Sequence, residues 1–136
     1  MIKTIALAGL LVFGLFSISA DAQKSVRLDK APAGFKVFFE KFRTAVARGD
    51  KATVASLTQF PFQYGFDAGD EGTWTKVQFI KKYNDIFVGE RKVFAQKNPL
   101  FYSEAGSYDL ATDDASHYSF VKKGNSYKFT SYIVEP

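Results

Sequence analysis

The sequence contains no cysteine and only one histidine and one tryptophan among its 136 residues. Without cysteine there is no disulfide framework and no thiol nucleophile, so burial of side chains must hold the fold together. No Gly-x-Ser-x-Gly nucleophile elbow occurs. Residues 67–72 lack the Asp-x-Asp-x-Asp-Gly spacing of a calcium loop. We therefore expect no metal and no cofactor.

Concentrated charge of one sign is also missing. The net charge is +4, and paired basic residues such as Lys81-Lys82 and Lys122-Lys123 are scattered among acidic ones. Nucleic-acid binding needs a basic face, so these pairs are interpreted as solvated surface. No nucleic-acid partner is expected.

The one long apolar run, residues 5–18, is shorter than the about 20 residues that span a bilayer. Lys3 precedes it, and Ala20-Asp21-Ala22 provides an Ala-x-Ala cleavage site. This pattern predicts a signal peptide over residues 1–22, cut between Ala22 and Gln23. We expect a periplasmic or secreted protein without a membrane anchor after cleavage; an uncleaved N-terminal anchor is the alternative.

After the signal, residues 23–33 are polar and contain Pro32, which indicates a flexible lead-in. Residues 34–136 are then long enough for a single domain with one core.

Aromatic residues are abundant, with 15 Phe and 7 Tyr. Residues 35–48 predict a helix with one buried stripe, because apolar side chains recur at helical spacing; these are Phe35, Phe38, Phe39, Phe42 and Val46. Gly49 is expected to end this helix. Asp50 is expected to cap a second helix over residues 51–58.

A third helix is predicted over residues 76–88, opened by a capping box of Thr75 and Gln78 and ended by Gly89. Residues 60–66 place an aromatic ring at every second position, which is typical of a strand with one buried face. Pro61 indicates an edge strand or a strand start. Residues 67–72 are predicted to form a turn or short loop.

Strand patterns occupy the rest of the chain, at residues 92–96, 100–104, 107–112, 117–123 and 126–134. A two-residue turn at Gly124-Asn125 pairs Phe120 with Phe129 and Tyr118 with Ser131. A three-residue loop at residues 113–115 pairs Leu110 with Tyr118 and Tyr108 with Phe120. Together the two registers predict a core side made of Tyr108, Leu110, Tyr118, Phe120, Phe129 and Ile133. The outer side would carry Asp109, His117, Ser119, Val121, Lys128, Thr130, Tyr132 and Val134. The predicted fold class is α+β, with N-terminal helices packed on a curved antiparallel sheet.

Four motifs carry a resemblance to a known family. They are Phe-x-x-Phe-Phe-x-x-Phe-x-x-Ala-Val-x-x-Gly-Asp over residues 35–50, Phe60-Pro61-Phe62, the ring pattern of residues 79–87, and the closing segment 120–129. With the predicted order of elements, residues 34–134 resemble the nuclear transport factor 2-like superfamily, the cone-shaped branch of the cystatin-like folds. The resemblance implies a cone that opens at one end and often a sheet-to-sheet dimer.

Members of that family include isomerases, dehydratases, epoxide hydrolases, lipid or polyketide binders and non-catalytic exported domains. Its enzymes typically place an Asp near the first strand and a Tyr on the first helix. Here the inner helix positions are Phe or Val, and no carboxylate occurs in the strand before Asp67. Steroid-isomerase chemistry is therefore not implied.

Polar-tipped aromatic residues are the candidates for lining a cavity inside the cone: Tyr64, Trp74, Tyr83, Tyr108 and Tyr118. Such a cavity would suit an apolar ligand oriented by phenol hydroxyls. The alternative is that these rings are core residues whose hydroxyls reach solvent or backbone.

His117 is the natural general base by residue type, but the register places it on the outer face beside Tyr132. With Val121, Tyr132 and Val134 it forms a candidate homodimer face, with scattered surface apolar residues as the alternative.

We expect an exported, non-catalytic binding domain for a small apolar ligand or a protein partner. One alternative is an isomerase or lyase that uses Asp67 or Asp85 with Tyr64 or Tyr83. The other is a protein inhibitor or immunity-like factor that acts by surface docking.

Overall fold

The computed structural model describes residues 24–87 and 91–135. Within these ranges five α-helices and one curved, unclosed sheet of seven strands form a mixed architecture, which confirms the predicted α+β class. The predicted signal peptide and the helix-ending role of Gly89 lie outside the described residues.

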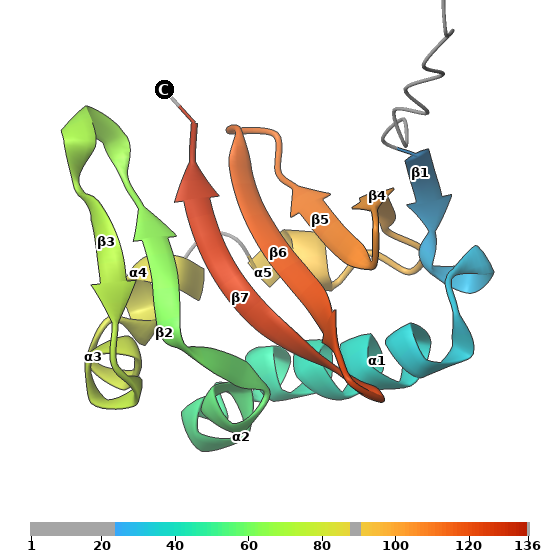
Figure 1. The fold of residues 1–136 in the computed structure, drawn as a ribbon, viewed down its shortest axis with the longest axis horizontal. Coiled ribbons are helices and arrows are strands. Elements are labelled where there is room, and N and C mark those ends of the chain that lie inside the picture. Colours follow the sequence, from blue (N-terminus) through green and yellow to red (C-terminus); the bar gives the residue numbers. More distant parts are fainter. Residues whose placement is uncertain (1–23, 88–90, 136) are drawn as a thin grey trace, which may run out of the picture.

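The sheet has the strand order β1-β4-β5-β6-β7-β2-β3. Its strands are β1 (Lys24–Arg27), β2 (Thr58–Gly65), β3 (Glu71–Trp74), β4 (Leu100–Glu104), β5 (Ser107–Ala111), β6 (Ser116–Lys123) and β7 (Ser126–Val134). All neighbours pair antiparallel except β2 and β7, which run parallel. Figure 1 shows the helices gathered on one side of this sheet, so its other face lies open.

The helices are α1 (Ala33–Arg48), α2 (Lys51–Ser56), α3 (Lys76–Lys81), α4 (Tyr83–Phe87) and α5 (Arg91–Phe94), with 3₁₀ turns η1 (Leu28–Lys30) and η2 (Asp67–Gly69). Gly49 ends α1 in the left-handed region at φ 66°, and the Asp50 carboxylate accepts the Thr53 amide at 3.1 Å. Both predicted caps are confirmed. None of the helices in the described ranges is long and apolar enough to cross a membrane.

The predicted phenylalanine stripe of α1 is the centre of the core. Its rings are at most 7% exposed and contact rings from the sheet in edge-on, tilted and stacked arrangements. Phe42 lies 5.1 Å from the Phe120 centroid at 83°, and 5.1 Å from Phe129. Phe35 stacks on Tyr108 at 4.0 Å. Tilted and edge contacts of this kind add specific energy to the area that the rings bury.

The predicted helix over residues 76–88 is two helices, because the chain breaks at Lys82 (φ −94°, ψ 4°). The capping box of Thr75 and Gln78 is confirmed. Phe79, Ile86 and Phe87 are all fully buried. The break lets each of the two short helices direct these side chains toward the curved sheet. One straight helix would fit the curvature of the sheet less well.

The segment predicted as a flexible lead-in is ordered where the structure describes it. Lys24–Arg27 forms β1 against β4, and η1 follows, with Leu28 and Ala31 buried. The Leu28 amide donates to the Pro99 carbonyl at 3.0 Å. The prediction was wrong because the partner strand lies more than seventy residues away and leaves no local signal.

Two further strand predictions need correction. Residues 92–96 are not a strand, since Arg91–Phe94 is the helix α5, in which adjacent Val93 and Phe94 are both buried. The turn predicted at residues 67–72 ends in an unpredicted strand, β3, which forms a hairpin with β2. In both places tertiary packing overrides the local pattern.

Pro61 does not mark an edge or a strand start, because β2 has neighbours on both sides. The pairing of β2 with β7 changes register between Thr58 and Gln63, and Pro61 lies within that irregular stretch. An interior strand can hold proline there, since a bulge relieves the need for a ladder amide.

A bulge in β7 changes which residues face the core. Phe120 pairs with Phe129 as predicted, but the register then shifts, so that Tyr118 pairs with Tyr132 and not with Ser131. Thr130 is the extra residue. Tyr132 is consequently 5% exposed, Val134 packs on the core, and Ile133 moves to the outer face. The expected positions of these three residues were therefore reversed.

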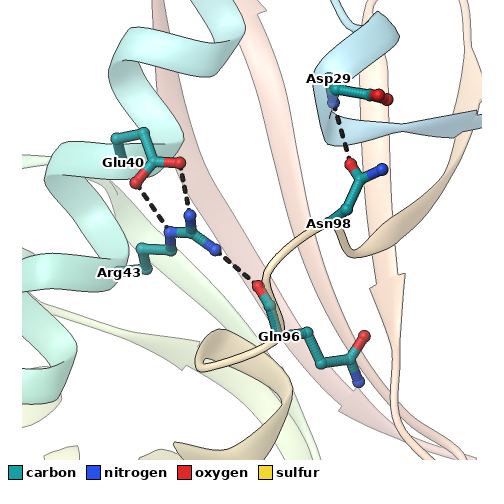
Figure 2. A network of polar contacts seen from close by, with 5 residues as sticks. All are labelled: Asp29, Glu40, Arg43, Gln96 and Asn98. Carbon is teal, nitrogen blue, oxygen red and sulfur yellow. Dashed lines mark hydrogen bonds and ion pairs between the residues drawn. The ribbon is translucent and has the colours of Figure 1, made fainter.

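A polar brace holds the loop between α5 and β4 against the N-terminal half of the chain (Figure 2). Arg43 makes two hydrogen bonds to the Glu40 carboxylate, at 2.5 and 2.8 Å, and one to the Gln96 carbonyl at 2.7 Å. The side-chain oxygen of Asn98 accepts the Asp29 amide at 3.0 Å. These bonds fix the loop that leads into β4.

Candidate functional site

The structure brings two of the five predicted cavity-lining residues together at a surface hollow. Tyr64 on β2 and Trp74 on β3 stack at 4.2 Å with 16° between their planes, and Phe66 lies about 6 Å from both rings. We call this space the β2–β3 hollow. Its lining residues are Tyr64, Phe66, Asp70, Trp74, Lys82 and Asp85, and its volume is about 500 Å³.

Local sequence explains why these rings meet. Tyr64 pairs with Gly72 across the hairpin, and a Cβ at Gly72 would lie 3.1 Å from the Tyr64 hydroxyl. Glycine therefore leaves the space in which the Tyr64 ring lies across β3 and reaches Trp74. The stack continues inward from Trp74 to Phe62, which is fully buried. The platform is thus anchored in the core through Trp74, which is only 7% exposed, and reaches solvent through the partly buried Tyr64 and Phe66.

Charged side chains surround the platform. Lys82, at the break between α3 and α4, lies 3.9 Å from the Asp85 carboxylate, and both side chains are more than half exposed. Asp70 precedes β3 on the opposite side. The hollow thus offers flat apolar surface together with two carboxylates and one ammonium.

The other three predicted residues lie in the core. Tyr83 and Tyr118 are fully buried, and the Tyr118 hydroxyl donates to the Ile86 carbonyl at 2.5 Å. Tyr108 is 6% exposed, and burial, followed by the charge of Tyr127, raises its pKa above the ordinary value. These rings support the fold, in agreement with the core alternative.

The carboxylates considered for catalysis are exposed to water. Asp67 lies in η2, and Asp85 is 61% exposed while Tyr83, two residues before it, is fully buried. The enzyme alternative required a carboxylate and a phenol in one water-poor pocket. The observed placement does not supply that arrangement.

A second hollow, of about 790 Å³, lies on the open side of the β2–β3 hairpin, and we call it the outer hollow. Asp67 and Glu71 line it on one side, and Ile133, Val134 and Glu135 at the end of β7 line it on the other. Ile133 packs against Gly65 there, where a Cβ would lie 3.1 Å away.

His117 lies on the open face of the sheet, as predicted. Its Nδ1 is 2.6 Å from an Asp109 oxygen, its Nε2 is 3.4 Å from Glu135, and the Ser119 hydroxyl donates to the other Asp109 oxygen at 3.1 Å. Val121 also lies on this face, whereas Tyr132 and Val134 do not, so the predicted dimer face keeps two of its four residues. Across the described ranges, no three His, Asp or Glu side chains form a group able to hold a metal ion.

Comparison with protein-family models, curated proteins and solved structures found no match.

Sequence reasoning missed Phe66, Asp70 and Lys82 as parts of the β2–β3 hollow, because neither the strand β3 nor the break at Lys82 was predicted. Asp109 was recoverable, since the predicted register already placed it opposite Ser119 and diagonal to His117. Glu135 was not, because its position depends on the bulge at Thr130.

Proposed function

We propose that this protein is an exported, non-catalytic binding domain of the nuclear transport factor 2-like type, which holds a small, flat, apolar ligand in the β2–β3 hollow. The order of two helices (α1 and α2), the β2–β3 hairpin, three further helices and the antiparallel meander β4 to β7 supports this assignment of type. The predicted signal peptide supports export to the periplasm or the exterior.

The observation that carries the proposal is the aromatic platform of Tyr64, Phe66 and Trp74 at a hollow of about 500 Å³. That volume is in the range of small-molecule sites, which combine apolar walls with a few placed polar groups. The interior of the cone is filled by the rings of α1 and the sheet. The hollow at its rim is therefore the place where aromatic surface meets solvent.

Charged groups at the hollow would orient the ligand. Lys82 and Asp85 lie on the helix side and Asp70 on the hairpin side. A ligand with a flat apolar body and a polar substituent at one end would stack on the rings and hydrogen-bond to these side chains. The exposed positions of Asp67 and Asp85 favour binding over proton-transfer catalysis.

The only tryptophan of the chain, Trp74, makes the test direct. We would titrate the protein with N-phenyl-1-naphthylamine, a neutral flat probe, and follow quenching of Trp74 emission. We expect saturable quenching. Y64S should weaken the apparent affinity about tenfold, since an aromatic contact contributes about 1.5 kcal/mol and 1.4 kcal/mol corresponds to a factor of ten.

Tyr102 provides the matched control. It is an exposed tyrosine on β4, far from the hollow in strand order, and Y102S should bind the probe like the wild type. Quenching that does not saturate, or an equal loss of affinity in both variants, would contradict the proposal.

A further inference from the structure

The single histidine lies between two carboxylates that come from different parts of the chain. His117 Nδ1 faces Asp109 of β5 at 2.6 Å, and Nε2 faces Glu135, just after β7, at 3.4 Å. The His117 and Asp109 side chains are 24% and 21% exposed, and Glu135 is 63% exposed. One partner is thus held within the sheet, and the other follows the last residue of β7 and is exposed.

This geometry favours one protonation state of the ring. A carboxylate only accepts hydrogen bonds, and a neutral imidazole has one donor nitrogen and one acceptor nitrogen. Both nitrogens of His117 can donate only in the imidazolium form. When the proton leaves, the shorter bond to Asp109 keeps the remaining N–H, and the Nε2 lone pair faces the Glu135 carboxylate.

The surroundings of His117 favour the imidazolium. Burial is the largest single influence and lowers the pKa of His117, but the hydrogen bond and charge of Asp109, with smaller contributions from Glu135, outweigh it. The net effect raises the pKa above its ordinary value of 6.5. The hydrogen bond from Ser119 to Asp109 holds the carboxylate in place.

Among the residues that the structure describes, Asp109 and Glu135 are the charged groups that act on His117. On β5 the cross-strand partner of His117 is Ala111 and the charged residue is Asp109, while on β7 the partner is Ile133 and the charged residue is Glu135 beyond the strand end. On β6 itself, Ser119 is the next residue on this face. Loss of the proton therefore leaves two carboxylates beside a neutral ring.

We propose that His117 is a pH-dependent latch, which holds Glu135 to the sheet while the ring is protonated and releases it when the proton passes to solvent. The latch acts on the turn between β5 and β6 as well, because the Glu135 amide donates to the Ala115 carbonyl at 3.0 Å. Glu135 also lines the outer hollow. Release would therefore open one wall of that hollow.

Nuclear magnetic resonance of the full chain tests this latch, since one histidine gives one set of ring signals. We would titrate the His117 ring and measure hydrogen exchange of the Glu135 amide, corrected for the intrinsic effect of pH. We expect a midpoint above 6.5, and at least a fivefold loss of Glu135 protection across that same midpoint.

The variant E135Q separates the latch from a merely structural contact. A glutamine amide can accept a hydrogen bond from the imidazolium through its oxygen, or donate to the neutral ring through its nitrogen. E135Q should therefore keep the amide of residue 135 protected on both sides of the His117 midpoint, whereas E135A should leave it unprotected at every pH. Constant protection in the wild type while the ring titrates would overturn the proposal, as would the same pH-dependent loss in E135Q.

Discussion

Single aromatic side chains of α1 connect the helix to several strands at once. Phe42 contacts rings of β6 and β7 as well as Phe87 of α4 and Phe94 of α5. It is fully buried, so its removal would leave a void among side chains that cannot all move inward. Most of the core depends on such shared contacts.

We expect F42A to lower the free energy of unfolding by about 3–5 kcal/mol, the usual range for a buried phenylalanine. Urea unfolding followed by circular dichroism would measure the change. V37A is the matched control, because Val37 is on the same helix but 73% exposed, and it should change stability by less than about 0.5 kcal/mol. Equal effects of the two substitutions would refute the assigned orientation of α1.

At the residue scale, the stripe of α1 was predictable because helical periodicity survives in any environment that buries one side. The roles of the individual tyrosines were harder to predict from the sequence. Tyr64 and Tyr83 look alike in sequence, yet one lies at a hollow and the other in the core. The difference arises from Gly72 beside Tyr64 and from the break at Lys82. The spacing of apolar residues in the sequence predicts neither feature.

Among the elements, β7 shows how one inserted residue sets the orientation of a strand end. Phe129 faces the core, Thr130 is the extra residue, Ser131 pairs with Ser119 on the outer face, and Tyr132 faces the core again. Without Thr130 the strand would alternate regularly and keep the same residues inside.

We therefore expect deletion of Thr130 to be tolerated, with a loss of less than about 2 kcal/mol from the missing hydrogen bond of its hydroxyl to the Ser119 carbonyl. Deletion of Lys128 is the control. It lies in the regular part of β7, and its removal would turn the buried Tyr127 or Phe129 outward. Thermal unfolding of both variants would compare them, and a larger loss for the Thr130 deletion would show that the bulge has another role.

Local signals predicted α1, α2, the capping box and the strands β4 to β7, because each of these elements carries its own periodicity or cap. The strands β1 and β3 and the helix α5 were missed. Each is four residues long, too short for a period to be recognised, and each depends on a partner elsewhere in the chain.

For the molecule as a whole, β1 joins the first described residues to the sheet through β4. The brace of Figure 2 lies next to this junction. There the backbone carbonyl of Asn98 also accepts a hydrogen bond from the Arg27 guanidinium at 3.2 Å. Leu28 adds a buried apolar contact. The N-terminal segment is thus part of the domain and extends it beyond the predicted boundary at residue 34.

A chain that begins at Pro32 should be less stable than one that begins at Lys24 by at least about 2 kcal/mol, because the loss of buried Leu28 alone costs about 2–5 kcal/mol. Urea unfolding of the two chains would give the difference in their free energies of unfolding. The longer chain, measured with the same tag and in the same buffer, is the control. Equal midpoints would show that β1 and η1 contribute nothing to the fold.

Because the sheet does not close into a barrel, β1 and β3 each have one row of backbone amides and carbonyls beside which the described residues place no strand. Such borders are templates on which strands of other molecules add and fibrils grow. Here both borders are four residues long, and they carry Lys24 and Arg27 at one side and Glu71 at the other. Because these edge strands are short and charged, strands of other molecules pair with them poorly, which disfavours amyloid-like assembly of this aromatic-rich protein.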